Sequence, residues 1–203
     1  MRAIRLAVTA LTLLCMAANP GDADPLITKT YSYFTIHGHT GGDLERELSK
    51  RGPLLHGTGI RHPGATRIKL GGSIKYENTG GKCRVIDATV NLETHLTLPR
   101  WKNRNGASRE TVMVWDTLSS DIKRHEERHA EIARQYARKL EKALESLRPQ
   151  RDCKTMEQRV DATSRKIIDK HAADQERFDR VEAASFERRM LRMLRFKVQK
   201  QLN

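Results

Sequence analysis

Hydrophobic and polar residues alternate along the first half of the chain, and this pattern predicts β-strands. The clearest run covers residues 86–98, and two shorter runs rich in aromatic and β-branched residues cover 31–36 and 68–76. A period of two is typical of a half-buried strand. The apolar face of the clearest run consists of Ile86, Ala88, Val90, Leu92, Leu96 and Leu98. Pro99 is expected to end this strand. We therefore expect a small, mostly antiparallel sheet.

A short helix is predicted between the first two strands. Thr40 and Asp43 stand three residues apart, the spacing of an approximate capping box at the start of a helix over residues 44–50. Gly52-Pro53 ends that helix, and the stretch of glycines and prolines up to residue 65 is predicted to be a loop.

The second half of the chain changes to a period of three to four residues, which predicts helices. The pattern becomes helical from Ser108, and a single apolar stripe runs along a predicted helix over residues 120–147. The stripe consists of Ile122, His125, His129, Ile132, Tyr136, Ala143 and Leu147. After a break at Pro149, a second long helix is predicted from residue 155 to 190 or beyond, folding back as an antiparallel hairpin. The expected fold class is therefore α+β, with the sheet and short helix first and the two long helices after them.

The first long helix contains the sequence His-Glu-x-x-His at His125, Glu126 and His129. Residues four apart share a helix face, so both imidazoles can bind one zinc ion, while Glu126 can act as general base on a water. Both histidines fall in the apolar stripe and are expected to face the interior. Glu126 lies at the edge of the stripe, where we expect it to meet water. The alternative interpretation is a charged helix with two core histidines that satisfy their nitrogens by hydrogen bonds.

Zinc requires a third protein ligand, and the second long helix carries candidate residues. The apolar stripe of that helix includes Val160, Ile167, Phe178 and Val181. Because His171 and Asp174 fall in the same stripe, periodicity makes them candidate ligands. Glu182 is a further candidate.

The N-terminus has the layout of a secretory signal peptide, with a basic start, an apolar run over residues 6–18 and small residues after it. We expect residues 1–23 to be removed, leaving 24–203 as a single domain with a strand-rich part (31–101) and a helical part (108–203). The expected location is periplasmic or secreted. Cleavage also removes Cys15, and the remaining Cys83 and Cys153 are expected to form a disulfide, the usual state of a cysteine pair in an exported protein.

The chain carries 38 Lys and Arg residues against 25 Asp and Glu, a net charge of +13. Such a balance favours anionic partners, although solvated helix faces would give the same count. Basic and apolar residues mix at helical spacing over residues 186–197, so this segment could lie on an anionic envelope surface. Nucleic acid is not expected as a partner, because that interpretation rests on charge alone and conflicts with export.

Several of these motifs occur in an order that resembles the DUF922 family, predicted secreted zinc-dependent proteases of bacteria. They are the Tyr-x-x-Phe-x-Ile strand from Tyr31, Arg51-Gly52-Pro53, Gly81-Lys82-Cys83-Arg84-Val85, Leu98-Pro99-Arg100-Trp101 and His125-Glu126-x-x-His129. The resemblance covers most of residues 30–185. It implies a zincin-like domain in which His125 and His129 bind zinc and Glu126 is the base.

The resemblance also bears on the third ligand. Phe178-Asp179 match an aromatic-Asp pair of the family, which makes Asp179 the first choice for a carboxylate ligand. Ala184-Ser185 stand where the family has His-Gly, so the chain departs from the family pattern there.

Two functions follow from these observations. The first is an exported zinc metallopeptidase that acts on peptides or proteins. The alternative is a non-catalytic envelope protein with a degenerate metal site, whose basic helices bind an anionic surface or a protein partner. The sequence contains no signal for an oligomeric state.

Overall fold

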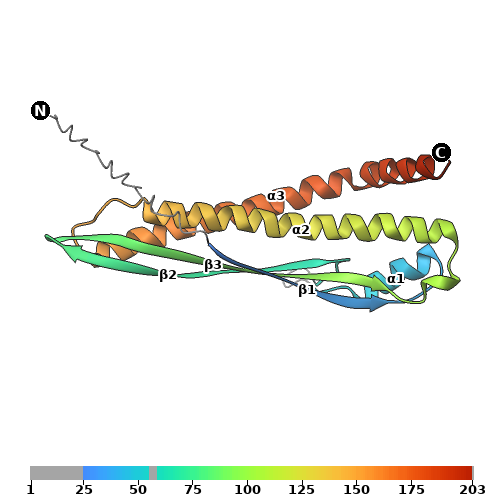
Figure 1. Cartoon of the computed structure of the whole chain (residues 1–203), viewed down its shortest axis with the longest axis horizontal. Coiled ribbons are helices and arrows are strands. Elements are labelled where there is room, and N and C mark those ends of the chain that lie inside the picture. The colour runs from blue at the N-terminus through green and yellow to red at the C-terminus, as the bar shows by residue number, and fades with distance from the viewer. Residues whose placement is uncertain (1–24, 55–58, 203) are drawn as a thin grey trace, which may run out of the picture.

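The computed structural model describes residues 25–54 and 59–202, so the predicted signal peptide lies outside the described residues. A long, narrow sheet lies along one helix, and a second helix runs beside the first in the opposite direction (Figure 1). The α+β prediction is confirmed. The elements are β1 (Leu26–Ile36), α1 (Gly41–Arg51), β2 (Ala65–Thr79), β3 (Lys82–Trp101), the 3-10 turn Arg104–Gly106, α2 (Arg109–Glu145) and α3 (Cys153–Leu202).

The sheet has the strand order β1-β3-β2, so β3 is central and β2 is an outer strand. The longer pairing, between β2 and β3, is antiparallel as expected, whereas β1 runs parallel to β3. Pro99 does not end the central strand, and that prediction is wrong: β3 continues to Trp101. The pairing with β2 stops at Ala65 opposite Thr97, so Pro99 lies beyond β2 at a free edge, where a residue without an N–H group is tolerated.

A β-bulge shifts the alternation at the start of β3. Lys75 pairs with Asp87 and Tyr76 pairs with Val85, which leaves Ile86 as the extra residue. The bulge turns Ile86 outward, so its side chain is 53% exposed, and Val85 packs against the core instead. The prediction that Ile86 faces the core is therefore wrong.

Helix α2 covers one face of the sheet, chiefly over β3 (Figure 1). The small side chains of Ala133 and Ala137 are fully buried and let the helix approach the sheet closely. The helix begins at Arg109 with Ser108 as its N-cap, earlier than the predicted start near residue 120. Its first turns belong to a second apolar cluster around Trp101 and Trp115, which the single predicted stripe did not include.

Helix α3 packs antiparallel to α2 and is tied at its first residue to the sheet. The predicted disulfide between Cys83 and Cys153 is confirmed, with both Cα atoms 4.9 Å apart. Backbone hydrogen bonds of 2.8 Å in both directions between Cys83 and Gln150 hold the same junction.

The predicted capping box at Thr40 and Asp43 is also present in α1. Within the described residues, no helix combines the length and apolar character needed to cross a membrane.

Candidate metal centre

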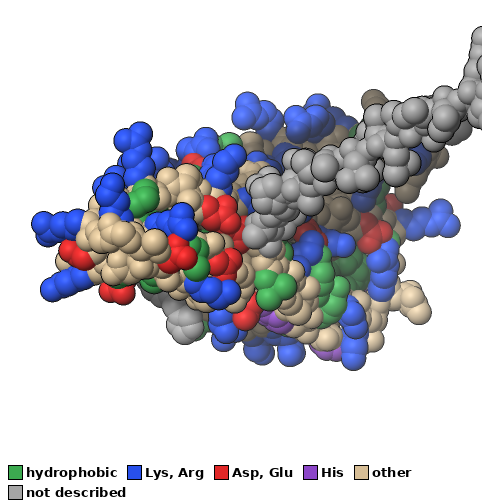
Figure 2. All heavy atoms as spheres, turned by 60° about the vertical axis from the view of Figure 1, so that its left-hand side comes forward, with side chains coloured by type: hydrophobic (Ala, Val, Ile, Leu, Met, Phe, Trp, Pro, Cys, Tyr) green, Lys and Arg blue, Asp and Glu red, His purple; other side chains and the backbone are tan. Residues whose placement is uncertain are grey.

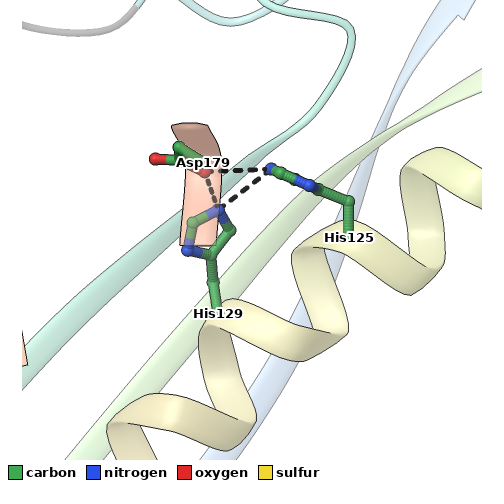
Figure 3. Close-up of side chains that lie close together, drawn as sticks. All are labelled: His125, His129 and Asp179. Carbon is green, nitrogen blue, oxygen red and sulfur yellow. Dashed lines mark hydrogen bonds and ion pairs between the residues drawn. The ribbon is translucent and has the colours of Figure 1, made fainter. Parts of the chain in front are cut away.

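Two turns of neighbouring helices bring three potential ligand atoms together. His125 and His129 lie one turn apart on α2, and Asp179 approaches them from α3 (Figure 3). The two Nε2 atoms are 3.0 Å apart, and the Asp179 Oδ1 atom lies 3.3 Å from the Nε2 of His125 and 3.0 Å from that of His129. Among residues 25–54 and 59–202, this is the only group of His, Cys, Asp or Glu side chains with such convergence.

The three side chains open onto a cleft of about 500 Å³. One wall comes from residues 62–66 and Ile68 at the start of β2, and the other comes from α2 and α3. The lining is largely apolar next to the converging ligands, with Ile122 and Phe186 on opposite helices. The cleft therefore gives a small molecule or a chain segment access to the three potential ligands.

Gln175 fixes the orientation of His129. Its Oε1 atom lies 2.6 Å from His129 Nδ1, and its Nε2 atom donates to the His129 carbonyl at 3.1 Å. Because an amide oxygen only accepts, Nδ1 carries a proton, so in the neutral tautomer the lone pair lies on Nε2 and points towards Asp179. Two acceptor atoms thus face each other at 3.0 Å. A cation between them would remove the repulsion.

His125 has a ring contact on one face and a carboxylate near its edge. Its ring stacks on Phe178 with centroids 4.9 Å apart, and its Nδ1 atom lies 3.8 Å from a Glu182 oxygen. Burial lowers the pKa of His125, and the neighbouring His129 acts in the same direction. The imidazole is therefore neutral at neutral pH, as a metal ligand must be.

Glu126 lies in the same cleft but is not at a solvated edge, and that prediction is wrong. Its side chain is only 5% exposed. Thr66 on β2 donates to Glu126 Oε2 at 2.7 Å, and a Cβ atom at Gly64 would lie 2.8 Å from Oε1. Burial raises the pKa of Glu126, partly offset by the Thr66 hydrogen bond. Helix α2 packs against both α3 and the sheet. The turn that directs the two histidines towards α3 therefore directs Glu126 towards the sheet.

Three consecutive side chains of this turn contact three different elements. His125 contacts Asp179 on α3, and Glu126 accepts a hydrogen bond from Thr66 on β2. Glu127 accepts hydrogen bonds from Lys29 and Tyr31 on β1. The turn therefore joins the sheet to the second long helix.

The other predicted ligands are engaged elsewhere. His171 accepts a hydrogen bond from Gln175 at 2.8 Å and packs on the Tyr136 ring, and Asp174 accepts from the Tyr136 hydroxyl at 2.7 Å. Glu182 forms ion pairs with Arg124 and, at 3.2 Å, with Arg189. None of the three belongs to the converging group: Glu182 lies 3.8 Å from Nδ1 of His125, and Asp179 alone of the four candidates approaches the Nε2 atoms of both histidines.

Residues 31–186 match a protein family described as "Bacterial protein of unknown function (DUF922)". The chain belongs to the DUF922 family. No curated protein and no solved structure matches this DUF922 chain. The matched segment contains every residue of the converging group together with Glu126, Thr66 and Gln175.

The converging atoms of this DUF922 protein fit a zinc ion in number, type and spacing. Two ligand atoms bound at about 2.1 Å to a tetrahedral zinc lie about 3.4 Å apart. The three separations here are 3.0, 3.0 and 3.3 Å. Two imidazole nitrogens and one carboxylate oxygen are also ligand types that zinc takes in catalytic sites, where a fourth position stays open.

Sequence reasoning missed the residues that support this group. Gln175 lies four residues from both His171 and Asp179, so a polar residue on the same helix face was the available signal. Thr66 gave no local signal, because it reaches Glu126 from 60 residues away. Asp121 also gave no local signal for its pairing with Arg189, which is 68 residues away. It is buried and forms an ion pair with Arg189 through two contacts of 2.9 and 3.0 Å.

Proposed function

We propose that this protein is an exported zinc metallopeptidase whose zinc is held by His125, His129 and Asp179. The observation that carries the proposal is the convergence of these three ligand atoms at 3.0–3.3 Å in a cleft that also contains the Glu126 carboxylate. A structural zinc site would be closed by a fourth protein ligand. Within the described residues no fourth His, Cys, Asp or Glu joins the group, which favours a site that receives a substrate.

Glu126 is the residue to which we assign proton transfer. Zinc, when bound, acidifies a water and polarises a carbonyl group. Thr66 holds Oε2 of Glu126 and leaves Oε1 to accept the proton of the attacking water. The same oxygen then delivers this proton to the nitrogen of the leaving amine. Burial raises the pKa of Glu126, which makes its carboxylate a stronger base for the first half of this transfer.

The outer strand of the sheet supports a peptide as the substrate. Strand β2 has β3 on one side and no strand on the other within the described residues. Its first residues, Ala65 and Thr66, form a wall of the cleft. An extended peptide can pair its backbone with such an edge, and this binding mode is independent of side-chain sequence.

The disulfide supports export. Cytosolic thiols are kept reduced, so a disulfide between Cys83 and Cys153 suits an oxidising compartment. The predicted signal peptide leads to the same proposal. Determining the N-terminus of the protein recovered from the periplasm or medium tests this point: cleavage near residue 18 or 23 is expected, and an N-terminus at Met1 would contradict export.

Metal content and hydrolysis test the two parts of the proposal separately. We expect the purified protein to contain one zinc per chain by mass spectrometry, and His125→Ala and His129→Ala to lose it. Glu126→Gln should keep zinc but lose cleavage of a proteome-derived peptide library by at least about a hundredfold. A wild-type protein that does not bind zinc, or full cleavage by the Glu126→Gln variant, would overturn the proposal.

A second candidate function is a non-catalytic envelope protein that keeps the fold with a degenerate metal site and binds an anionic surface or a protein partner through its basic helices. It is favoured by Ala184-Ser185, which differ from the His-Gly expected at this point from the family resemblance. Zinc binding by the wild type without cleavage of any library peptide would select this candidate over the peptidase.

A further inference from the structure

Side chains in the last turns of α3 make no polar contact with the rest of the described chain, although Met190, Met193, Leu194 and Lys197, which share one helix face, are half-buried. The side chain of Arg189 makes the final anchor, through its ion pairs with Asp121 and Glu182. Beyond it, the side chains of residues 190–201 form no hydrogen bond, ion pair or ring contact within the described chain, and none of them belongs to either apolar cluster. Figure 1 shows α3 drawing away from α2 towards its C-terminus. We call residues 190–202 the C-terminal tail.

The composition of the C-terminal tail differs from that of the face shown in Figure 2. Lys, Arg, Asp and Glu side chains are intermixed on the face shown in Figure 2. The tail has four basic residues and no acidic one: Arg192, Arg195, Lys197 and Lys200. Its positive charge is therefore not neutralised by its own residues or by contacts with the described part of the chain.

The tail also exposes large apolar side chains. Leu191 is 48% exposed, Phe196 66% and Val198 41%. Leu191, Leu194 and Val198 have the spacing of one helix face, and Arg192 and Arg195 have the spacing of a neighbouring face. A helix that combines an exposed apolar face with unpaired basic residues has the two features that bind an amphipathic helix to an anionic lipid surface.

We propose that the C-terminal tail docks on an anionic phospholipid surface, with its apolar side chains in the headgroup–acyl boundary and its basic side chains against lipid phosphates. The charge favours lipid over a second copy of the chain, because two tails pairing with each other would bring eight positive charges together without an acidic residue. This docking does not depend on the metal centre or on peptidase activity.

Docking would also place the cleft close to the lipid surface. Phe186 and Arg189 line the cleft, and the tail begins at the next residue of the same helix. At about 1.5 Å rise per residue, Phe196 lies roughly 10 Å along the helix axis from Arg189. The tail would therefore hold the opening of the cleft near chains that emerge from, or lie on, the membrane.

A flotation assay of the full chain with vesicles tests the electrostatic part. Vesicles of phosphatidylglycerol and phosphatidylcholine should bind the wild type, and the triple variant Arg192→Glu, Arg195→Glu, Lys200→Glu should bind about a hundredfold more weakly, at about fivefold per basic residue removed. The matched control is Arg159→Glu, Arg165→Glu, Lys170→Glu, which makes the same charge change at exposed positions elsewhere on α3. Its affinity should fall by less than about fivefold. Equal losses in the two variants would overturn the assignment to the tail.

A second measurement reports insertion of the tail itself and does not depend on any other membrane-binding segment. The native Trp101 and Trp115 are buried, so an indole introduced by Val198→Trp, on the same helix face as Leu191, is the exposed reporter. Its emission should shift to shorter wavelength and be quenched by brominated phosphatidylglycerol vesicles, but not by phosphatidylcholine vesicles. Ile168→Trp, at a position 43% exposed on α3, is the matched control and should not respond.

Three outcomes of the fluorescence experiment would overturn the proposal. An unquenched V198W indole means that the apolar face of the tail does not contact lipid. Equal quenching in neutral and anionic vesicles means that charge does not select the surface. A blue shift without vesicles that grows with protein concentration means that a second copy, and not lipid, covers the tail.

Discussion

Gln175 on α3 accepts a hydrogen bond from Nδ1 of His129 on α2, at 2.6 Å and across 46 residues of sequence. This contact sets which nitrogen of His129 is free to bind a metal. It also connects His129 to His171 through the amide nitrogen of Gln175, at 2.8 Å. A ligand on one helix is thus oriented by the other.

Replacing Gln175 should weaken zinc binding without removing a ligand. In Gln175→Leu the His129 ring loses its acceptor, and we expect zinc affinity to fall about 10- to 100-fold, the usual effect of losing a hydrogen bond to a ligating histidine. Competition with a chromophoric chelator measures this affinity. Gln175→Glu keeps an acceptor at the same place and should recover most of it. Gln158→Leu, an exposed position on the same helix, is the control, and an equal loss there would contradict the assigned role.

Replacing Thr66 should shift the pH dependence of hydrolysis. The Thr66 hydroxyl lowers the pKa of Glu126, against the larger effect of burial, which raises it. Thr66→Val removes the lowering contribution, so the pKa of Glu126 rises and the acid limb of the pH–rate profile moves to higher pH. Activity at neutral pH should fall about tenfold, the effect of losing a hydrogen bond to a charged group. Thr66→Ser keeps the hydroxyl and should restore the profile, whereas an unchanged limb in Thr66→Val would exclude this role.

Glu126→Gln should stabilise the metal-free protein at high pH. Because burial places the folded-state pKa of Glu126 above its ordinary value of 4.5, the unfolded state binds fewer protons above that pH. Stability from this group is therefore fully present below pH 4.5 and is lost as the pH rises through the folded-state pKa. We expect a higher free energy of unfolding for the variant at pH 8, measured by urea denaturation, and a difference that vanishes near pH 4.

The neighbouring Glu127 is the control for that experiment and should show the opposite sign. Hydrogen bonds from Lys29 and Tyr31 outweigh partial burial and lower the pKa of Glu127. Its contribution is present above the ordinary pKa and is lost as the pH falls through the lowered value. Glu127→Gln should therefore destabilise the protein at pH 8. A gain in stability for both variants at pH 8 would show that loss of net negative charge, and not burial of Glu126, is responsible.

The disulfide should contribute strongly to stability. Cys83 and Cys153 are separated by 70 residues, and closing a loop of that length stabilises a fold by about 4 kcal/mol through the chain entropy of the unfolded state. Cys83→Ser with Cys153→Ser should lower the free energy of unfolding by about this amount in chemical denaturation. Reductant should have the same effect on the wild type and none on the double variant. Identical midpoints with and without reductant in the wild type would contradict the prediction.

Periodicity predicted the helices and strands well because each buries one continuous face. Periodicity failed where a neighbouring element changes which side chains are buried. Ile86 obeys the alternation in the sequence, but the bulge opposite Lys75 and Tyr76 turns it outward. Glu126 lies beside a single apolar stripe in the sequence, but α2 packs against both the sheet and α3, so two faces of the helix are buried. Such effects depend on register and packing partners, which the local pattern does not contain.

The candidate site was partly predictable for a related reason. The spacing of His125 and His129 is set by the helix itself, so their common direction follows from the sequence. The choice of a third residue depends on how α3 is aligned against α2. Periodicity favoured His171 and Asp174, which lie further along the same pair of helices, and only the family resemblance pointed to Asp179. The support from Thr66 and Gln175 comes from separate elements and required the fold.

The turn at residues 125–127 has a consequence for how the family can vary in length. Its three side chains contact α3, β2 and β1 in succession, and each added residue rotates a helix by about 100°. One insertion between the N-cap Ser108 and His125 would direct each of the three towards the wrong neighbour. We therefore expect this interval to tolerate no insertion or deletion, and its length to be the same throughout the family.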